Sequence, residues 1–171
     1  MKTIVSILTI LTLSFGSVSM SDNELCSSLK TEEITEKIDY EGRIRRVLES
    51  EELDSYTIEL IVAQSKLESG DYKNTLTPYN NVFARHYHKS DTFAISAGAK
   101  AEGHSRFAKY PSVESATLSQ LWYFRKKNYS FNWKSPYQFA LELKQKRYYE
   151  ADIMVYTKGL IRHMRETKNK N

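Results

Sequence analysis

The chain has 171 residues, 25 Lys and Arg against 21 Asp and Glu, a formal charge of +4 at pH 7, and 40% hydrophobic residues. This composition is ordinary for a folded globular protein and excludes a disordered or fibrous chain. One cysteine, Cys26, excludes an internal disulfide, so stability must come from a hydrophobic core. The mildly basic balance favours approach to anionic polymers such as nucleic acid, membrane surfaces or cell-wall polymers, without choosing among them.

Residues 1–20 have the pattern of a cleavable secretory signal. Lys2 precedes an apolar run from Ile4 to Phe15, and the small residues Ser17 and Ser19 follow at the positions that a signal peptidase requires. The run is shorter than the roughly 20 apolar residues of a membrane-spanning helix. We therefore expect a secreted or periplasmic protein with no stable membrane insertion after cleavage. An uncleaved membrane anchor is the alternative.

The remaining residues suit one domain. We predict a polar linker and a helix over 21–52, a single domain over 53–166, and a frayed tail over 167–171. The N-terminal helical pattern, over 32–51, indicates one helix or two that are broken near Gly42. The next helix begins at Asp54 or Ser55, which can accept hydrogen bonds from its first backbone amides, and ends at Ser69 before Gly70.

The segment from 71 to 111 changes character and contains short runs rich in β-forming residues. We predict two or three strands of a small antiparallel sheet, over 81–87, 92–97 and 105–110. Helices are predicted afterwards over 113–127, from Ser135 to about 146, and over 151–166. The predicted fold class is therefore α+β and mostly helical, with one small antiparallel β excursion directly after the central helix.

The central helix places one carboxylate in an unusual position. At about 100° per residue, two opposite faces are apolar, formed by Ile58, Ile61, Val62 and Ser65 and by Leu60, Ala63 and Leu67. Of the two polar strips between them, one holds Glu59 and Lys66 and can face solvent. The other holds Gln64 and Glu68. Burial would raise the pKa of Glu68 and suit it to general acid catalysis, although an ordinary surface glutamate near a helix end is the alternative.

Four sequence blocks in chain order, within about 53–164, carry a family resemblance. They are Ala63-Gln64 with Glu68-Ser69-Gly70; Asn80-Asn81-Val82-Phe83-Ala84; Phe107, Tyr110, Ser112, Glu114 and Ser115; and Leu143-Lys144 with Tyr148, Tyr156, Lys158 and Leu160. The chain resembles the bacterial glucosaminidase domain family, of the glycoside hydrolase family 73 type, within the lysozyme-like superfamily. Ala84 departs from the family pattern, because a glycine is usual there.

The resemblance implies hydrolysis of the β-1,4 bond between N-acetylglucosamine and N-acetylmuramic acid in peptidoglycan. A muramidase specificity is not distinguished by sequence. In this reading Glu68 donates a proton to the leaving oxygen. The predicted substrate-binding residues are Tyr148, Asn81, Gln64 and Phe83, where Asn81 either holds its loop or touches an acetamido group. We expect Tyr149 and Tyr156 to fix the last helix.

A second catalytic carboxylate is expected in many glycosidases. The candidates are Glu102, between Ala101 and Gly103, and Asp91. A substrate-assisted route, in which the acetamido group of the sugar attacks its own anomeric carbon, would need no second protein acid.

No cofactor is expected. His86, His88 and His104 suggest a metal site, but no neighbouring carboxylate or cysteine completes a tetrahedral ligand set, so none is predicted. Nucleic-acid binding has charge alone in its favour. The expected partner is the glycan strand of peptidoglycan, bound by a monomer. The rival hypotheses are a non-catalytic wall-binding module of the same fold and, more distantly, a basic exported protein that binds an anionic polymer.

Overall fold

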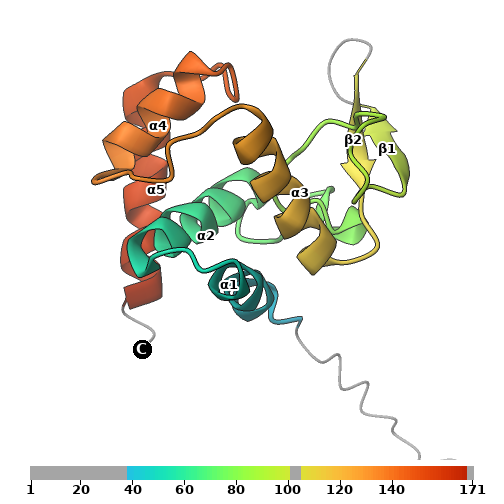
Figure 1. The fold of residues 1–171 in the computed structure, drawn as a ribbon, viewed down its shortest axis with the longest axis horizontal. Helices are drawn as coiled ribbons and strands as arrows, with labels where there is room; N and C mark the ends of the chain where they lie inside the picture. The colour runs from blue at the N-terminus through green and yellow to red at the C-terminus, as the bar shows by residue number, and fades with distance from the viewer. Residues whose placement is uncertain (1–37, 101–104, 169–171) are drawn as a thin grey trace, which may run out of the picture. The chain divides into compact units, whose positions relative to one another are not determined.

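We describe the fold from a computed structural model, which describes residues 38–100 and 105–168. The predicted signal peptide, most of the linker and the candidate acid Glu102 lie outside these residues. The elements are α1 (Tyr40–Ser50), α2 (Ser55–Ser69), the 3-10 helix η1 (Thr77–Tyr79), β1 (Ser96–Lys100), β2 (Arg106–Lys109), α3 (Val113–Lys126), α4 (Pro136–Gln145) and α5 (Ile153–Lys168) (Figure 1). The predicted class, mostly helical α+β, is confirmed. The predicted frayed tail begins too early, since α5 continues to Lys168.

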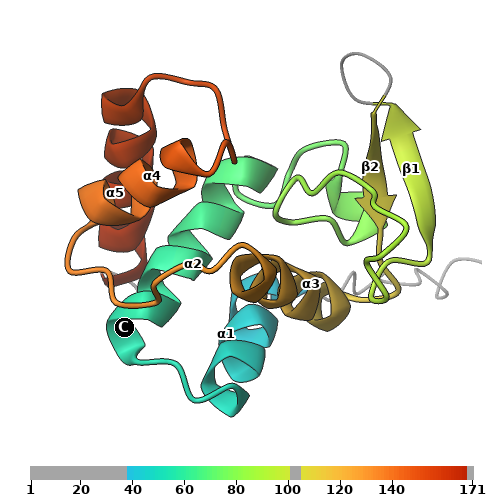
Figure 2. The same ribbon diagram turned by 45° about the horizontal axis from the view of Figure 1, so that its top comes forward.

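Helix α2 is the central element of residues 38–168. The two ribbon views show α4 and α5 to one side of it and the β-hairpin towards the other (Figures 1 and 2). The side chain of Asp54 begins the helix by accepting hydrogen bonds from the backbone N–H groups of Tyr56 and Thr57, at 3.0 and 3.1 Å. Gly70 ends it in the left-handed conformation, with φ 57°. Ten of its fifteen residues are buried. The predicted burial of α2 therefore holds.

Helix α1 covers the polar strip of α2, formed by Glu59 and Lys66, that the sequence analysis assigned to solvent. Glu41 accepts from the buried Lys66 at 3.0 Å, and Arg45 donates to Glu59 at 2.8 Å. The prediction of a solvent-facing strip is thus wrong, because helix periodicity does not show which polar strip a second helix covers. Helix α1 also runs unbroken through Gly42, whose N–H donates to the capping Asp39.

The hydrophobic core includes α1 and does not begin at residue 53. Ile44 and Leu48 are fully buried with the core residues of α2 and α3. Arg43 reinforces this packing through a two-pronged contact with Glu114 at the start of α3. The compact unit accordingly begins at Ile38, which moves the predicted domain boundary towards the N-terminus.

The sheet has two antiparallel strands, β1 and β2, with Ser96 opposite Lys109 and Ala97 opposite Ala108. The register shifts between Ala97 and Lys100. The predicted strand over 81–87 is absent from the structure, and this segment contributes only an isolated bridge from His86 to Phe107. The physical reason is local, since Asn80 and Ala84 adopt positive φ, of 54° and 49°, which a β-strand does not permit.

Helices α2 and α5 approach each other closely at Gly159. A Cβ atom on Gly159 of α5 would lie 2.8 Å from Cδ1 of Leu67 on α2, so the absence of a side chain permits this approach.

Within 38–100 and 105–168, the helices are too short or too polar to cross a membrane.

Candidate active site

A cleft of about 1070 Å³ opens beside the C-terminal end of α2. Its walls come from the end of α2, the segment that precedes the sheet, β2, the end of α3, and the connection between α4 and α5. It is lined by Glu68, Ala84, Arg85, His86, Tyr87, His88, Phe107, Trp122, Tyr123, Lys126, Lys127, Arg147, Tyr148, Tyr149 and Glu150. The predicted proton donor therefore lies in a cleft large enough for sugar rings.

Glu68 is the strongly perturbed acid of this cleft. Burial raises its pKa from 4.5 to about 7, against a smaller opposing effect of a hydrogen bond from Tyr156. The Tyr156 hydroxyl donates to Oε1 of Glu68 at 2.6 Å. Near neutral pH the carboxyl group consequently has a proton to give, and one of its oxygens has a fixed partner. Both properties suit a general acid.

Tyr156 makes a contact with Glu68 that the sequence did not predict. We expected both Tyr149 and Tyr156 to fix the last helix, and Tyr149 does so, with its hydroxyl donating to the carbonyl of Ala140 at 3.0 Å. Its ring stacks on that of Tyr156, with centroids 3.8 Å apart and planes 7° apart. Tyr156, held in this way, reaches Glu68. The sequence signal for Tyr156 was its position in the fourth family block. Its hydrogen bond to Glu68, 88 residues away, could not be predicted from the sequence.

Tyr148 lines the cleft as predicted, whereas two other predicted substrate-binding residues lie beneath the surface. Phe83 and Gln64 are fully buried, so this placement does not support direct contact with a ligand. The Tyr148 hydroxyl donates to the carbonyl of Phe83 at 2.8 Å and lies 3.5 Å from Oε1 of Gln120. Gln120 in turn donates to Gln64 at 3.3 Å. Phe83 therefore holds Tyr148 directly, and Gln64 holds it through Gln120.

Asn81 holds its loop, which is one of the two roles that the sequence left open. Its side chain is fully buried and donates to the carbonyls of Arg85, at 2.8 Å, and Ala108, at 3.0 Å. Its Oδ1 accepts from the backbone N–H of Arg85 at 2.8 Å. No surface remains for an acetamido group. These bonds fix the cleft wall from Asn81 to Arg85 against β2.

Ala84, in the place of the usual family glycine, keeps a backbone conformation that favours glycine, with φ 49°. We expect Ala84→Gly to stabilise the fold by about 1 kcal/mol, because relief of left-handed strain exceeds the entropy that glycine adds to the unfolded chain. Thermal unfolding should show a higher midpoint temperature. A matched Ala97→Gly change in β1, where φ is not positive, should lower it. An Ala84→Gly midpoint below that of the wild type would contradict the strain.

Asp91 does not line the cleft, which removes the basis for predicting it as the second acid. It is buried and accepts hydrogen bonds from Ser119 Oγ at 2.6 Å, Tyr110 Oη at 3.1 Å and the Phe93 N–H at 3.1 Å. The Asp91 carboxylate thus receives three hydrogen bonds from groups inside the fold. The sequence could not reveal these partners, because Tyr110 and Ser119 follow 19 and 28 residues later.

We expect Asp91→Asn to act on stability and not on chemistry. An amide nitrogen would face donors in place of an acceptor, so the free energy of unfolding should fall by about 1–3 kcal/mol. Urea unfolding measures this change. Turnover per folded molecule should stay close to that of the wild type, and a specific loss of turnover with unchanged stability would restore Asp91 as a candidate acid.

The histidines of the cleft contribute an edge contact and a turn. His86 meets Phe107 edge-on, with ring centroids 5.1 Å apart, and Nδ1 of His88 lies 2.7 Å from Ser90 Oγ. A different histidine, His163 on α5, forms the one cluster of potential metal ligands within the described residues, together with Asp71 and Glu166.

The His163 cluster is better explained by hydrogen bonds than by a metal. Nδ1 of His163 lies 3.2 Å from both Asp71 Oδ1 and Glu166 Oε2, and Nε2 lies 3.0 Å from a guanidinium nitrogen of Arg162. Since a guanidinium group only donates, Nε2 is the acceptor, and Nδ1 carries the proton towards the carboxylates. No lone pair is then directed at the acids to bind a metal. The cluster joins α5 to the turn after α2.

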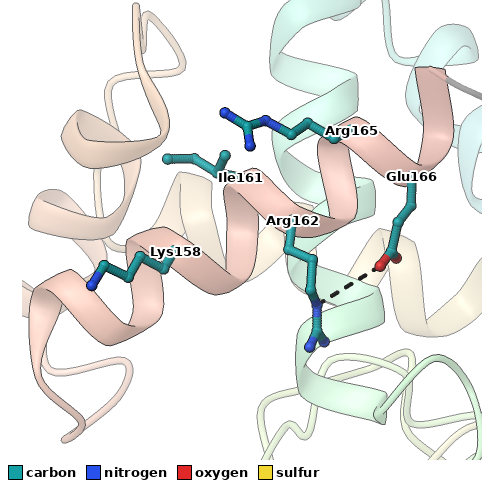
Figure 3. Close-up of a pocket in the computed structure, with 5 residues that line it drawn as sticks. All are labelled: Lys158, Ile161, Arg162, Arg165 and Glu166. Atoms are coloured by element: carbon teal, nitrogen blue, oxygen red, sulfur yellow. Dashed lines mark ion pairs between the residues drawn. The ribbon is translucent and has the colours of Figure 1, made fainter.

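A second, smaller hollow of about 440 Å³ is formed by α5 alone. Its lining residues are Lys158, Ile161, Arg162, Arg165 and Glu166, and Figure 3 shows the ion pair between Arg162 and Glu166 across one helical turn. Its acid, Glu166, is exposed and paired with Arg162, so this hollow is helix surface. The cleft beside Glu68 is therefore the candidate active site.

A mostly helical unit with a small hairpin and a central helix that ends at the cleft is a fold of the lysozyme-like type. A solved structure, that of a type VI secretion system effector-immunity complex from Pseudomonas protegens, is similar in fold. The TM-score is 0.57 and the identity 18%, over 74% of this chain and 86% of that chain.

The chain belongs to the glucosaminidase family. The family model described as mannosyl-glycoprotein endo-β-N-acetylglucosaminidase matches residues 44–169. Among curated proteins, none matches the chain significantly. The family resemblance predicted from the four sequence blocks is thereby confirmed, and membership points to glycoside hydrolase activity. The matched segment also includes the second half of α1, in agreement with the core.

Proposed function

We propose that this protein is an exported peptidoglycan hydrolase that cleaves the β-1,4 bond between N-acetylglucosamine and N-acetylmuramic acid, with Glu68 as the general acid. The observation that carries the proposal is the carboxyl group of Glu68, which lines the cleft, has a pKa near 7 and accepts a hydrogen bond from Tyr156. The signal-like residues 1–20 support export, and family membership supports the glycan substrate.

In the proposed reaction, Glu68 gives its proton to the glycosidic oxygen as the bond to the anomeric carbon breaks. The leaving sugar departs as an alcohol, and positive charge develops on the remaining ring. Tyr156 then stabilises the carboxylate that forms, because its hydroxyl already donates to Oε1. The oxygen of a water molecule then bonds to the anomeric carbon, and the proton that the water loses restores the acid form of Glu68.

The sequence leaves two candidates for the group that assists on the opposite face of the sugar, Glu102 and the acetamido group of the substrate, and the structure adds a third. Among the described residues, Glu150 is the other carboxylate that lines the cleft, so it joins Glu102 as a candidate. A comparison of Glu102→Gln with Glu150→Gln tests these options. The variant with the larger loss of turnover identifies the acid, and near-wild-type rates for both favour substrate assistance.

The decisive test of the proposed function is mass analysis of the fragments released from purified peptidoglycan. A glucosaminidase leaves N-acetylglucosamine at the new reducing end, whereas a muramidase leaves N-acetylmuramic acid. We expect the first product. If the wild-type protein binds peptidoglycan but releases no fragment, the enzyme hypothesis fails, and the wall-binding module is the remaining explanation.

A further inference from the structure

The cleft contains a buried cation that has no anionic partner among residues 38–100 and 105–168. Arg85 is 8% exposed and lines the same cleft as Glu68. Its Nε has no hydrogen-bond partner, and within 38–100 and 105–168 no carboxylate forms an ion pair with the guanidinium group. The central carbon of this group lies 3.8 Å from the centre of the Tyr123 ring.

This arrangement costs free energy in the absence of a ligand. A guanidinium group keeps its charge at any ordinary pH, so burial cannot be relieved by loss of a proton. A cation–π contact offsets only part of the lost hydration. The buried acid Asp91 forms no ion pair with Arg85, and its oxygens accept hydrogen bonds from Tyr110, Ser119 and the backbone of Phe93 instead.

The position of Arg85 is fixed before any ligand arrives. Asn81 binds its backbone on both sides, through the N–H and the carbonyl, and Tyr123 supports one face of the guanidinium group. A planar fork held in this way suits a carboxylate, which can accept two parallel hydrogen bonds. Further cations line the cleft, at Lys126, Lys127 and Arg147, and they favour the approach of an anionic substrate.

We propose that Arg85 is a specificity-determining residue that binds a carboxylate of the glycan substrate in the Glu68 cleft. The inference rests on the proposed function, since it names the substrate feature that this cleft selects. Peptidoglycan offers two sources of carboxylate. One is the lactyl group of muramic acid, which is free where the stem peptide has been removed, and the other is the stem peptide itself. A polymer of N-acetylglucosamine alone offers neither.

The test compares three substrates: intact peptidoglycan, peptidoglycan glycan stripped of its peptides by an amidase, and a chitin oligomer. Arg85→Gln should raise KM for carboxylate-bearing substrate about ten- to hundredfold, the effect of losing one charge-assisted hydrogen-bond pair, and leave kcat within about threefold. KM for the chitin oligomer should not change. Arg85→Lys should recover part of the loss, because it keeps the charge without the fork.

The matched control is Lys73→Gln, which removes an exposed cation that does not line the cleft. It should change KM far less than Arg85→Gln does. A loss confined to the stripped glycan identifies the lactyl carboxylate, whereas a loss confined to intact peptidoglycan identifies the stem peptide. An equal loss on all three substrates, or no loss on any, overturns the proposal.

Two further measurements separate this inference from the proposed function and from a structural role. In a Glu68→Gln background, binding of stripped glycan and of chitin oligomer can be compared with and without Arg85→Gln, which tests the carboxylate contact without turnover. The selective loss of binding to stripped glycan or intact peptidoglycan supports the proposal even if the wild type proves inactive. Thermal unfolding should show no loss of stability in Arg85→Gln, and a clear drop would assign Arg85 to the fold.

Discussion

Glu68→Gln is expected to abolish clearing of purified peptidoglycan while the protein remains folded and able to bind it. Gln keeps the shape of the side chain and can still accept from Tyr156, but it has no proton to transfer. General acid catalysis contributes about 10²- to 10⁴-fold to rate, so turnover should fall by at least this range. A turbidity assay measures the loss. Glu49→Gln, an exposed change on α1, is the matched control and should retain full activity.

The pH dependence of the wild type gives an independent test of Glu68. The proposed mechanism requires the acid form of Glu68, so activity should fall as pH rises through about 7, the raised pKa of this group. The free energy of unfolding should also fall as pH rises. The contribution of Glu68 to stability is fully present below the unfolded pKa of 4.5, and it is lost as pH rises through the folded pKa of about 7. The shift corresponds to about 3 kcal/mol.

Glu68→Gln should consequently gain stability relative to the wild type as pH increases from 5 to 8. A rate profile with no group titrating above the ordinary glutamate range, or a variant that loses stability over this interval, would contradict the assigned environment.

Tyr156→Phe is expected to move the alkaline limb of the rate profile to higher pH. The hydroxyl of Tyr156 stabilises the ionised form of Glu68, so its removal raises the pKa further. A hydrogen bond to a charged group is worth about 1.5–3 kcal/mol, which corresponds to a shift of about one to two pH units. The maximal rate should fall about tenfold, because the carboxyl group loses its fixed partner.

Tyr149→Phe is the control for this change. Its hydroxyl bonds Ala140 and not Glu68, while its ring can keep the stack on Tyr156. We expect lower thermal stability and an unmoved alkaline limb. If Tyr156→Phe leaves the limb in place, or shifts it to lower pH, the hydrogen bond to Glu68 does not govern its acidity.

The elements that sequence predicted best are those determined by neighbours along the chain. Asp54 and Gly70 bound α2 as expected, Ser112 and Ser135 cap α3 and α4, and the placement of Glu68 on α2 follows from helix periodicity. The family blocks then placed Tyr148 at the cleft. These signals are local or depend on motif order, and neither requires knowledge of packing.

The remaining features depend on contacts between distant parts of the chain. Lys66 is buried because α1 supplies Glu41, and Asp91 is structural because α3 supplies Ser119. Arg85 was missed altogether, since an arginine after a turn gives no indication that its side chain is buried. The predicted strand over 81–87 failed because β propensity cannot detect the positive φ of Ala84.

The close approach of α5 to α2 at Gly159 links catalysis to the order of assembly. Tyr156 lies one helical turn before Gly159, and Glu68 follows Leu67 directly, so the same contact that seats the helix also buries the acid. Until α5 is seated, Glu68 is an ordinary hydrated glutamate at a helix end and is ionised at neutral pH. During refolding we therefore expect α2 to form before activity returns. Activity should return only when α5 has packed against α2.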